Sequence, residues 1–190
     1  MQLPELVAIT PSDPRDPAPW IVAMGAAGLP GLLVREPTRP PGEIAQLVDL
    51  ARRHVPTVWL HGASPHDPAL RTRVDGVHLP DDPRCSLPAG SWGRSCHHPD
   101  DALRAWSSGA SWVFLSPIHP PTSKPDDRRP PLGLEALRAL SGPVYALGGQ
   151  TPERHRAALA AGATGSAVLG DLWGRAPDEA AERVRAYLRR

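Results

Sequence analysis

Lysine and cysteine are scarce in this sequence, and long apolar runs are missing. Lys124 is the only lysine, and the net charge of +1 gives no strong field to attract nucleic acid or an anionic membrane. Cys85 and Cys96, the two cysteines, match neither a disulfide framework nor a zinc pattern, which predicts reduced thiols. No stretch approaches the roughly 18 apolar residues of a membrane helix, and the N-terminus lacks the basic start of a signal peptide. We therefore expect a cytoplasmic protein with neither a nucleic-acid nor a membrane partner.

The composition is that of a globular protein. Hydrophobic residues make up 41% of the 190 residues and charged residues 22%, which suits one domain over residues 1–190. The 25 prolines fall mostly between apolar runs, where they punctuate loops and do not indicate disorder. The sequence does not fix the oligomeric state, so a homo-oligomer is left open.

Residues 144–170 contain a complete β-α-β unit. The apolar run 144–147 leads into Gly149, and a helix then begins with Pro152 at its first position. The second apolar run, 166–169, ends at Gly170. Strands joined by such a crossover are parallel, and parallel sheets bind ligands at the carboxyl ends of their strands. We therefore expect both glycines to lie at a ligand-binding edge.

The same alternation runs through the whole chain. The expected strands are Leu6 to Thr10, Gly31 to Val34, Thr57 to Leu60, Gly76 to Leu79, Trp92 to Cys96, Trp112 to Leu115, Val144 to Leu147 and Ser166 to Leu169. The expected helices are Trp20 to Ala27, Glu43 to Arg53, Pro68 to Arg73, Pro99 to Ser107, Leu134 to Leu140, the helix that begins at Pro152, and Asp178 to Leu188, with a further helical turn over Asp171 to Gly174.

Eight strands that alternate with helices predict a (β/α)₈ barrel, also called a TIM barrel. The chain is short for this fold, and shortened helices after the third and fourth strands would explain its length. The alternative is an open, doubly wound sheet.

In such barrels, phosphate binds after strands seven and eight, which is where Gly148, Gly149 and Gly170 stand. The alternative is that these glycines only form tight turns. The expected rim also carries Arg35, His61, His97, Ser116 and a polar loop over residues 116–129. In this loop, Ser123 and Lys124 could bind a second anion such as a pyrophosphate, whereas the alternative is a solvated surface lysine.

Four stretches resemble the thiamine-phosphate synthase/TenI superfamily. They are V-D-G-V-H-L-P at 74–80, G-R-S-C-H at 93–97, F-L-S-P-I-H-P-P-T-S-K-P at 114–125 with P-L-G at 131–133, and Y-A-L-G-G-Q-T-P at 145–152 followed by A-G-A-T-G-S-A-V-L-G. The resemblance implies a (β/α)₈ barrel that binds 4-methyl-5-hydroxyethylthiazole phosphate or its carboxylated precursor. It also implies that the backbone N–H groups of Gly149, Leu169 and Gly170 hold the thiazole phosphate.

The synthase branch joins a pyrimidine pyrophosphate to the thiazole phosphate with Mg²⁺. This chain keeps the arginine of the family pattern after strand two, Arg35, but lacks its glutamine and lysine. After strand three, residues 60–63 contain neither a carboxylate nor an amide. After strand four, Pro83 stands at a magnesium-ligand position, although Asp82 could substitute by a one-residue shift. In the loop after strand six, Ser123 and Lys124 match anion-binding positions, but Pro121 replaces the usual threonine.

The TenI branch aromatises a carboxythiazole phosphate tautomer and needs neither metal nor pyrophosphate. Its G-R-S-x-H motif supplies a histidine at the end of strand five, which His97 matches, with Ser95 on the same side of the strand. An imidazole can take and give a proton near neutral pH, which suits this reaction. The alternative for His97 is a histidine that caps the following helix. We expect His78 to pack within the fourth strand and His98 to point away from the site, whereas His119 could approach the ligand.

The resemblance therefore favours a TenI-like isomerase whose catalytic residue is His97 and whose site binds a small-molecule thiazole phosphate without a cofactor. The substrate-binding candidates are Arg35, Ser95, Ser123 and Lys124. The alternatives are a thiamine-phosphate synthase that uses Mg²⁺ and a non-catalytic thiazole-phosphate-binding regulator. A zinc site formed by His61, His97 and His119 is a weaker hypothesis, because these residues follow separate strands and no zinc motif is present.

Overall fold

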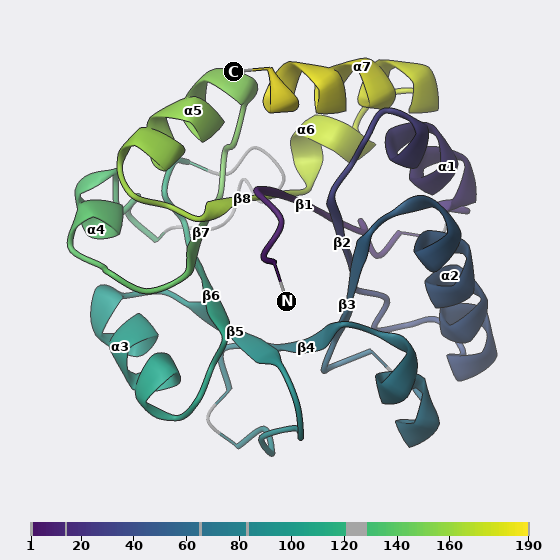
Figure 1. Cartoon of the computed structure of the whole chain (residues 1–190), viewed down its shortest axis with the longest axis horizontal. Coiled ribbons are helices and arrows are strands. Elements are labelled where there is room, and N and C mark those ends of the chain that lie inside the picture. The colour runs from purple at the N-terminus through teal and green to yellow at the C-terminus, as the bar shows by residue number, and fades with distance from the viewer. Residues whose placement is uncertain (1, 14, 65, 83, 121–128, 190) are drawn as a thin grey trace.

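The computed structural model is a closed barrel of eight parallel strands, and it describes residues 2–13, 15–64, 66–82, 84–120 and 129–189. Each strand pairs with its sequence neighbours, and the barrel closes where β1 pairs with β8 (Figure 1). This confirms the predicted (β/α)₈ fold and excludes an open sheet. The strands are β1 (Leu6–Ile9), β2 (Gly31–Val34), β3 (Thr57–His61), β4 (Gly76–Leu79), β5 (Trp92–Cys96), β6 (Trp112–Leu115), β7 (Val144–Leu147) and β8 (Gly165–Val168).

A ring of helices surrounds the barrel (Figure 1). The α-helices are α1 (Ala18–Ala26), α2 (Pro41–His54), α3 (Pro99–Ser107), α4 (Glu135–Arg138), α5 (Pro152–Ala160), α6 (Gly170–Trp173) and α7 (Pro177–Leu188), and one 3₁₀ helix, η1 (Pro68–Arg73), follows β3. Prolines occupy the first turns of six of these helices, α1, α2, η1, α3, α5 and α7, where the missing N–H costs no hydrogen bond. In the described part of the chain, none of these helices has the length and apolarity to cross a membrane.

Several predicted elements differ from the observed ones by one or two residues at an end. The helix expected from Leu134 to Leu140 is only the single turn α4, and β8 begins and ends one residue earlier than expected. The shortened connection after β3 is a 3₁₀ helix, and the described residues between β4 and β5 form no helix. These short connections account for a barrel built from few residues.

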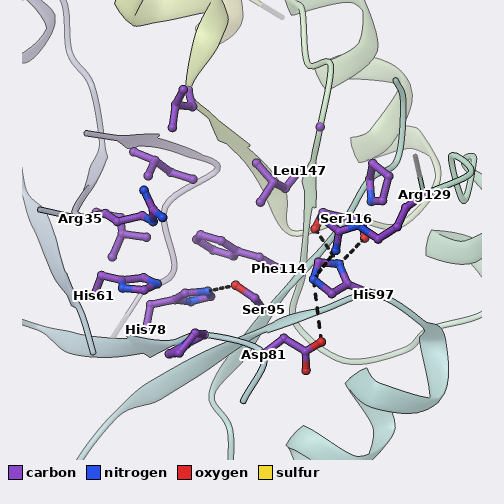
Figure 2. Close-up of a pocket in the computed structure, with 16 residues that line it drawn as sticks. Arg35, His61, His78, Asp81, Ser95, His97, Phe114, Ser116, Arg129 and Leu147 are labelled. Carbon is purple, nitrogen blue, oxygen red and sulfur yellow. Dashed lines mark hydrogen bonds and ion pairs between the residues drawn. The ribbon is translucent and has the colours of Figure 1, made fainter. Parts of the chain in front are cut away.

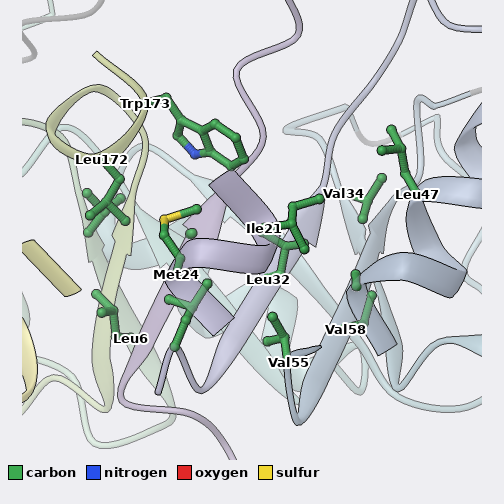
Figure 3. Close-up of a cluster of buried hydrophobic side chains, with 14 of the residues drawn as sticks. Leu6, Ile21, Met24, Leu32, Val34, Leu47, Val55, Val58, Leu172 and Trp173 are labelled. Carbon is green, nitrogen blue, oxygen red and sulfur yellow. The ribbon is translucent and has the colours of Figure 1, made fainter. Parts of the chain in front are cut away.

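The largest hydrophobic cluster lies between the sheet and the helices α1, α2 and α7. Ile21 and Met24 of α1 fill the layer between Leu32 of β2 and Trp173 of α6 (Figure 3). Apolar residues in α2 recur at Ile44 and its helical neighbours on the same face, so that one face is buried. Burial of this outer layer holds each helix against the sheet.

The barrel interior is filled by large aromatic rings. Trp59 of β3 stacks on Trp112 of β6, with ring centroids 3.9 Å apart and planes 11° apart, and Tyr145 meets Trp59 edge-on. The Tyr145 hydroxyl donates to the carbonyl of Pro4 over 2.8 Å, which ties the N-terminal segment across the bottom of the barrel (Figure 1). The interior below the rim is therefore a packed core, and the open end of the barrel is the carboxyl end of the strands.

The closing seam between β1 and β8 yields a stability prediction. A Cβ atom on Gly165 would lie 2.2 Å from the Glu5 carbonyl oxygen, which accepts a hydrogen bond from Ser166 in the same seam. We expect Gly165→Ala to lower the free energy of unfolding by about 1–3 kcal/mol, because the backbone must move apart.

The matched control is Gly42→Ala in α2, where a Cβ would meet no atom of the described residues within 4 Å. This change should be neutral or stabilise by up to about 1 kcal/mol, because alanine favours helices. Urea unfolding of the two variants measures the difference, and equal stabilities would contradict the close approach at the seam.

Candidate functional site at the carboxyl end of the barrel

The main cavity opens at the carboxyl ends of the strands and has a volume of about 270 Å³. Polar side chains from four successive strand ends and the loop after β6 converge on it (Figure 2). Labelled residues that line it are Arg35, His61, His78, Asp81, Ser95, His97, Phe114, Ser116, Arg129 and Leu147. Because each strand contributes from its last residues, the fold itself brings together groups that lie far apart in the sequence.

His97 follows β5, and its imidazole is oriented by the backbone. Its Nδ1 lies 2.8 Å from the carbonyl oxygen of Ser116, which can only accept, so Nδ1 carries a proton. In the neutral ring, Nε2 therefore holds the lone pair. Nε2 is in contact with the Arg129 guanidinium and lies 3.8 Å from a carboxylate oxygen of Asp81 (Figure 2). The side chain is 30% exposed, so a ligand in the cavity can reach it.

His61 ends β3 on the opposite side of the cavity. The backbone N–H of Ala63 donates to its Nδ1 over 3.2 Å, so a neutral His61 carries its proton on Nε2. Burial, together with the positive charge of Arg35, lowers the pKa of His61 from 6.5 to about 4. His61 is therefore a neutral hydrogen-bond donor at physiological pH.

Arg35 follows β2 and is held in place by the loop after β1. Its Nη1 donates to the Ser12 hydroxyl over 2.8 Å, and that hydroxyl donates to the Arg35 carbonyl over 2.5 Å. Ser12 adopts a left-handed backbone conformation with φ of 61°, which turns the loop back toward β2. The Thr10 hydroxyl also binds the Arg35 backbone. These hydrogen bonds fix the backbone of Arg35, whose side chain lines the cavity.

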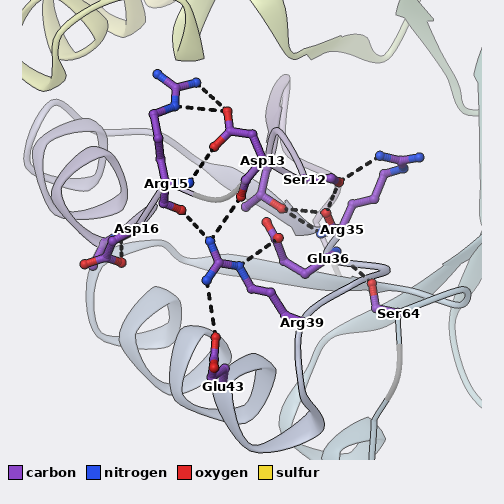
Figure 4. Close-up of polar contacts among 11 residues, drawn as sticks. Ser12, Asp13, Arg15, Asp16, Arg35, Glu36, Arg39, Glu43 and Ser64 are labelled. Atoms are coloured by element: carbon purple, nitrogen blue, oxygen red, sulfur yellow. Dashed lines mark hydrogen bonds and ion pairs between the residues drawn. The ribbon is translucent and has the colours of Figure 1, made fainter.

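A second arginine, Arg39, fastens the same loop to the rim (Figure 4). It donates to the carboxylate of Glu36 over 3.0 Å, and Glu36 is almost fully buried. The remaining donors of Arg39 reach Glu43 and the carbonyls of Asp13 and Arg15. Glu36 is thus engaged in this ion pair, and it is not among the described residues that line the main cavity.

Glycines end β7 next to a second, narrower cavity. This cavity has a volume of about 30 Å³ and is lined by Gly148, Gly149, Leu169 and Gly170 among others, and Gly148 and Leu169 also line the main cavity. Gly148 and Gly149 have φ values of 99° and 56°, and a Cβ on Gly149 would lie 2.5 Å from the Pro120 carbonyl. Glycine is therefore required here by backbone conformation and by close approach.

The helix α6 begins at Gly170, directly beside this turn. No side chain of the described residues caps its N-terminus, and its first N–H groups have no partners within the helix. Asp171 also lines the narrow cavity, and its carboxylate binds Arg175 and Arg183 and accepts from the Tyr187 hydroxyl. The negative charge nearest the narrow cavity is thereby neutralised.

A series of buried hydrogen bonds supports the turn after β7. The Ser166 hydroxyl donates to Gln150 over 3.2 Å, and the Gln150 amide donates to the Gly148 carbonyl over 3.0 Å. Since the serine proton is used, Nδ1 of His155 donates to the Ser166 oxygen over 3.0 Å. These hydrogen bonds couple α5 and β8 to the carbonyl that sets the direction of the glycine turn.

The structure brings most of the predicted site residues together. Arg35, Ser95, His97 and the glycines line the two cavities, and His98 caps α3 away from the site, as expected. His119 does not line the main cavity, and the described residues contain no group of three His, Cys, Asp or Glu side chains that could hold a metal ion, so they do not support a zinc site formed by His61, His97 and His119. The candidates Ser123 and Lys124, together with Pro121 and Pro83, lie outside the described residues.

Sequence reasoning missed Asp81 and Arg129 as partners of His97. Both lie on loops, where no periodicity indicates direction, although their positions just after β4 and in the polar loop after β6 were visible. It also placed His78 in the core without seeing that it hydrogen-bonds to Ser95 at the cavity. Cys96 is excluded as a proton carrier at neutral pH, because burial raises the pKa of its thiol to about 12.

The described residues offer a poor site for Mg²⁺, which prefers several oxygen ligands. Asp81 is the one carboxylate among the described residues that line the main cavity. Asp82, the candidate substitute ligand, is instead bound by Arg84 in a bidentate pair. Across the described ranges, no cluster of three or more His, Cys, Asp or Glu side chains could hold a metal ion.

The fold and the site define a (β/α)₈-barrel protein with a polar cavity at the carboxyl ends of its strands and a glycine-rich turn after β7. A family model described as thiamine monophosphate synthase matches residues 6–172. The chain therefore belongs to this family, which lies in the superfamily that its motifs resemble.

Curated relatives and solved structures agree with this assignment. A thiamine-phosphate synthase from Salinibacter ruber is 38% identical over 156 residues, which cover 73% of this chain and 69% of that protein. One from Salinispora arenicola is 35% identical over 146 residues, covering 67% of this chain and 68% of that protein. The structure of thiamine phosphate pyrophosphorylase from Pyrococcus furiosus superposes with a TM-score of 0.78 at 21% identity and covers 96% of this chain and 93% of that chain, which supports the fold.

The neutral state of His61 gives a pH prediction. Its pKa is about 4 in the folded chain and 6.5 as the ordinary value, so the unfolded chain binds more protons between these limits. The free energy of unfolding should therefore fall as the pH is lowered from 6.5 to 4, with His61 contributing up to about 3 kcal/mol.

His61→Gln should show a shallower loss over this window, and His98→Gln, at an exposed residue, should follow the wild type. Denaturant unfolding at a series of pH values gives the slopes. Identical pH dependences for wild type and His61→Gln would show that His61 is not held neutral.

Proposed function

We propose that this protein is an enzyme of thiamine biosynthesis that binds a thiazole phosphate, and that its first candidate reaction is the synthesis of thiamine phosphate. The observation that carries this proposal is the identity of 38% and 35% to relatives named thiamine-phosphate synthase, over two thirds or more of this chain. In this reaction the thiazole nitrogen displaces pyrophosphate from the pyrimidine half.

The phosphate of the thiazole would occupy the narrow cavity between β7 and β8. Uncapped N–H groups at the start of α6 and the glycine turn after β7 offer donors, and Asp171 is neutralised by Arg183. The thiazole ring would then extend into the main cavity, because Gly148 and Leu169 line both spaces. Arg35 lies on that path and can pair with a second anionic group.

The chemistry of the cavity favours a second candidate, the aromatisation of a carboxythiazole phosphate tautomer. The described residues do not supply the oxygen ligands that Mg²⁺ would need, so we assign no step to a metal. The neutral ring of His97 holds the lone pair of Nε2 at the cavity beside Asp81, in contact with the Arg129 guanidinium, which a substrate must displace before Nε2 can act as a base. Nε2 can take a proton from one ring position and return it at another, while the Ser116 carbonyl keeps Nδ1 protonated.

One assay separates the two reactions. Purified protein is incubated with 4-methyl-5-hydroxyethylthiazole phosphate, the pyrimidine pyrophosphate and Mg²⁺, and separately with the carboxythiazole tautomer. Formation of thiamine phosphate supports the synthase, and conversion of the tautomer absorbance supports the isomerase. In the second case, His97→Asn should slow conversion by about 10²-fold or more, because it removes the proton carrier.

The matched control is His98→Asn, which changes the neighbouring histidine that caps α3, and it should keep the wild-type rate. Equal rates for His97→Asn and wild type would exclude His97 as the proton carrier. Binding of the thiazole phosphate without either reaction would support a non-catalytic regulator.

The phosphate position has its own test. Gly170→Leu places a side chain at the start of α6, so we expect the affinity for thiazole phosphate to fall by more than about tenfold, or 1.4 kcal/mol. Isothermal titration calorimetry measures this change, with Gly42→Ala as control, because Gly42 lines neither cavity. Unchanged affinity of Gly170→Leu would place the phosphate elsewhere.

A further inference from the structure

His78, Gly93 and Trp112 lie side by side on three neighbouring strands. The two outer residues are in contact across the glycine. The strand register pairs His78 of β4 with Gly93 of β5, and Gly93 with Trp112 of β6. A Cβ on Gly93 would lie 2.1 Å from Nε1 of Trp112. The indole therefore occupies the space that a side chain on β5 would fill, and it reaches across to β4.

The contact between Trp112 and His78 fixes the tautomer of the histidine. The indole N–H can only donate, and it lies 3.1 Å from Nδ1 of His78, so Nδ1 is an acceptor without a proton. His78 is fully buried, and burial, with a smaller contribution from His61, keeps its pKa well below 6.5. The single proton of the neutral ring is therefore on Nε2.

The tautomer of His78 in turn sets the direction of the Ser95 hydroxyl. Nε2 of His78 lies 3.0 Å from the Ser95 oxygen and must donate to it. The serine oxygen accepts this bond, so its own proton points elsewhere. Ser95 lies two residues after Gly93 on the same face of β5 and lines the main cavity (Figure 2).

We propose that Trp112 and His78 form a relay that holds Ser95 as a hydrogen-bond donor toward the ligand. The cavity then selects a ligand with an acceptor at this place, such as an unprotonated ring nitrogen or a carboxylate oxygen, and disfavours one with a donor. Ser95 is the specificity-determining residue, and His78 and Trp112 are positioning residues. The ligand half of this inference rests on the proposed function, because a thiazole phosphate carries such acceptors.

The relay can be tested without a ligand. Nitrogen NMR of the histidine rings distinguishes a protonated from an unprotonated Nδ1, and we expect His78 in the free protein to carry its proton on Nε2 alone. Trp112→Phe removes the donor but keeps an aromatic ring, so it should admit the other tautomer and change the His78 signals.

Trp59→Phe is the matched control. Trp59 stacks on Trp112 in the same core, but its Nε1 has no hydrogen-bond partner in the described part of the chain. It should therefore leave the His78 tautomer unchanged. A proton on Nδ1 of His78 in the wild type, or the same spectrum for wild type and Trp112→Phe, would overturn the relay.

Ligand binding tests the role of Ser95. Ser95→Ala should weaken binding of 4-methyl-5-hydroxyethylthiazole phosphate by about five- to tenfold and leave inorganic phosphate unaffected, because one hydrogen bond to the ring is lost. Trp112→Phe should weaken it by about threefold or more. In the double variant, Trp112→Phe should add nothing to the effect of Ser95→Ala, since it acts through that hydroxyl.

Additive losses in the double variant, or equal losses for inorganic phosphate, would overturn this role of Ser95. A wild-type protein that does not bind the thiazole phosphate would refute the proposed function and the ligand half of the inference. The NMR measurement still decides the relay in that case, so the two failures are distinguishable.

Discussion

The stack of Trp59 on Trp112 fills the middle of the barrel, and the residues of the site pack on the core that it forms. Phe114, which packs against Trp59, and His78, which Trp112 contacts, both line the main cavity, whereas neither indole does. Gly76 and Gly93 make room for Trp112, because a Cβ at either position would lie within 2.5 Å of its ring. A barrel with few residues thus obtains a solid interior from a few large rings rather than from many aliphatic side chains.

The hydrogen-bonding character of three histidines at the cavity follows from one fixed partner each. The Ser116 carbonyl, the Ala63 N–H and the Trp112 indole each bind one nitrogen of a histidine ring and so determine which nitrogen of the neutral ring carries the proton. The imidazole rings of His97, His61 and His78 therefore differ in which nitrogen can donate a hydrogen bond, although the side chains are identical. By comparison, Asp81 is the one carboxylate among the described residues that line the main cavity, whereas the named relatives are thiamine-phosphate synthases. A direct assay of both reactions therefore decides which one this protein catalyses.

The fold could be predicted from the sequence because each strand is an apolar run with clear ends. Residues 144–147 and 165–168 are flanked by glycines, and β2 and β6 are equally distinct, so the alternation alone indicated a barrel. The extent of α4 could not be predicted, because Leu134 to Leu140 carries a helical pattern that the structure uses for only one turn. Local propensity does not decide how far tertiary packing extends a helix.

The site was predictable only where it follows strand ends. Arg35, Ser95 and His97 occupy such places, and the barrel topology therefore determines their direction. Asp81 and Arg129 depend on loop conformations, which have no period in the sequence. The contact of Trp112 with His78 depends on the stagger between β4, β5 and β6, and the gap at Gly93 was its only visible sign.

Because Arg183 and Tyr187 bind Asp171, the last helix, α7, contributes to the electrostatics of the narrow cavity. Asp171 lines this cavity beside the start of α6, and both of these partners lie on α7. A shortened or permuted chain without α7 would keep every residue that lines this cavity and the pairing of Asp171 with Arg175, yet it would lose Arg183 and Tyr187 as partners of that carboxylate. For protein engineering, the proposed anion site therefore includes side chains on α7 that act on it through charge. These side chains lie some fifteen residues beyond Gly170 in the sequence.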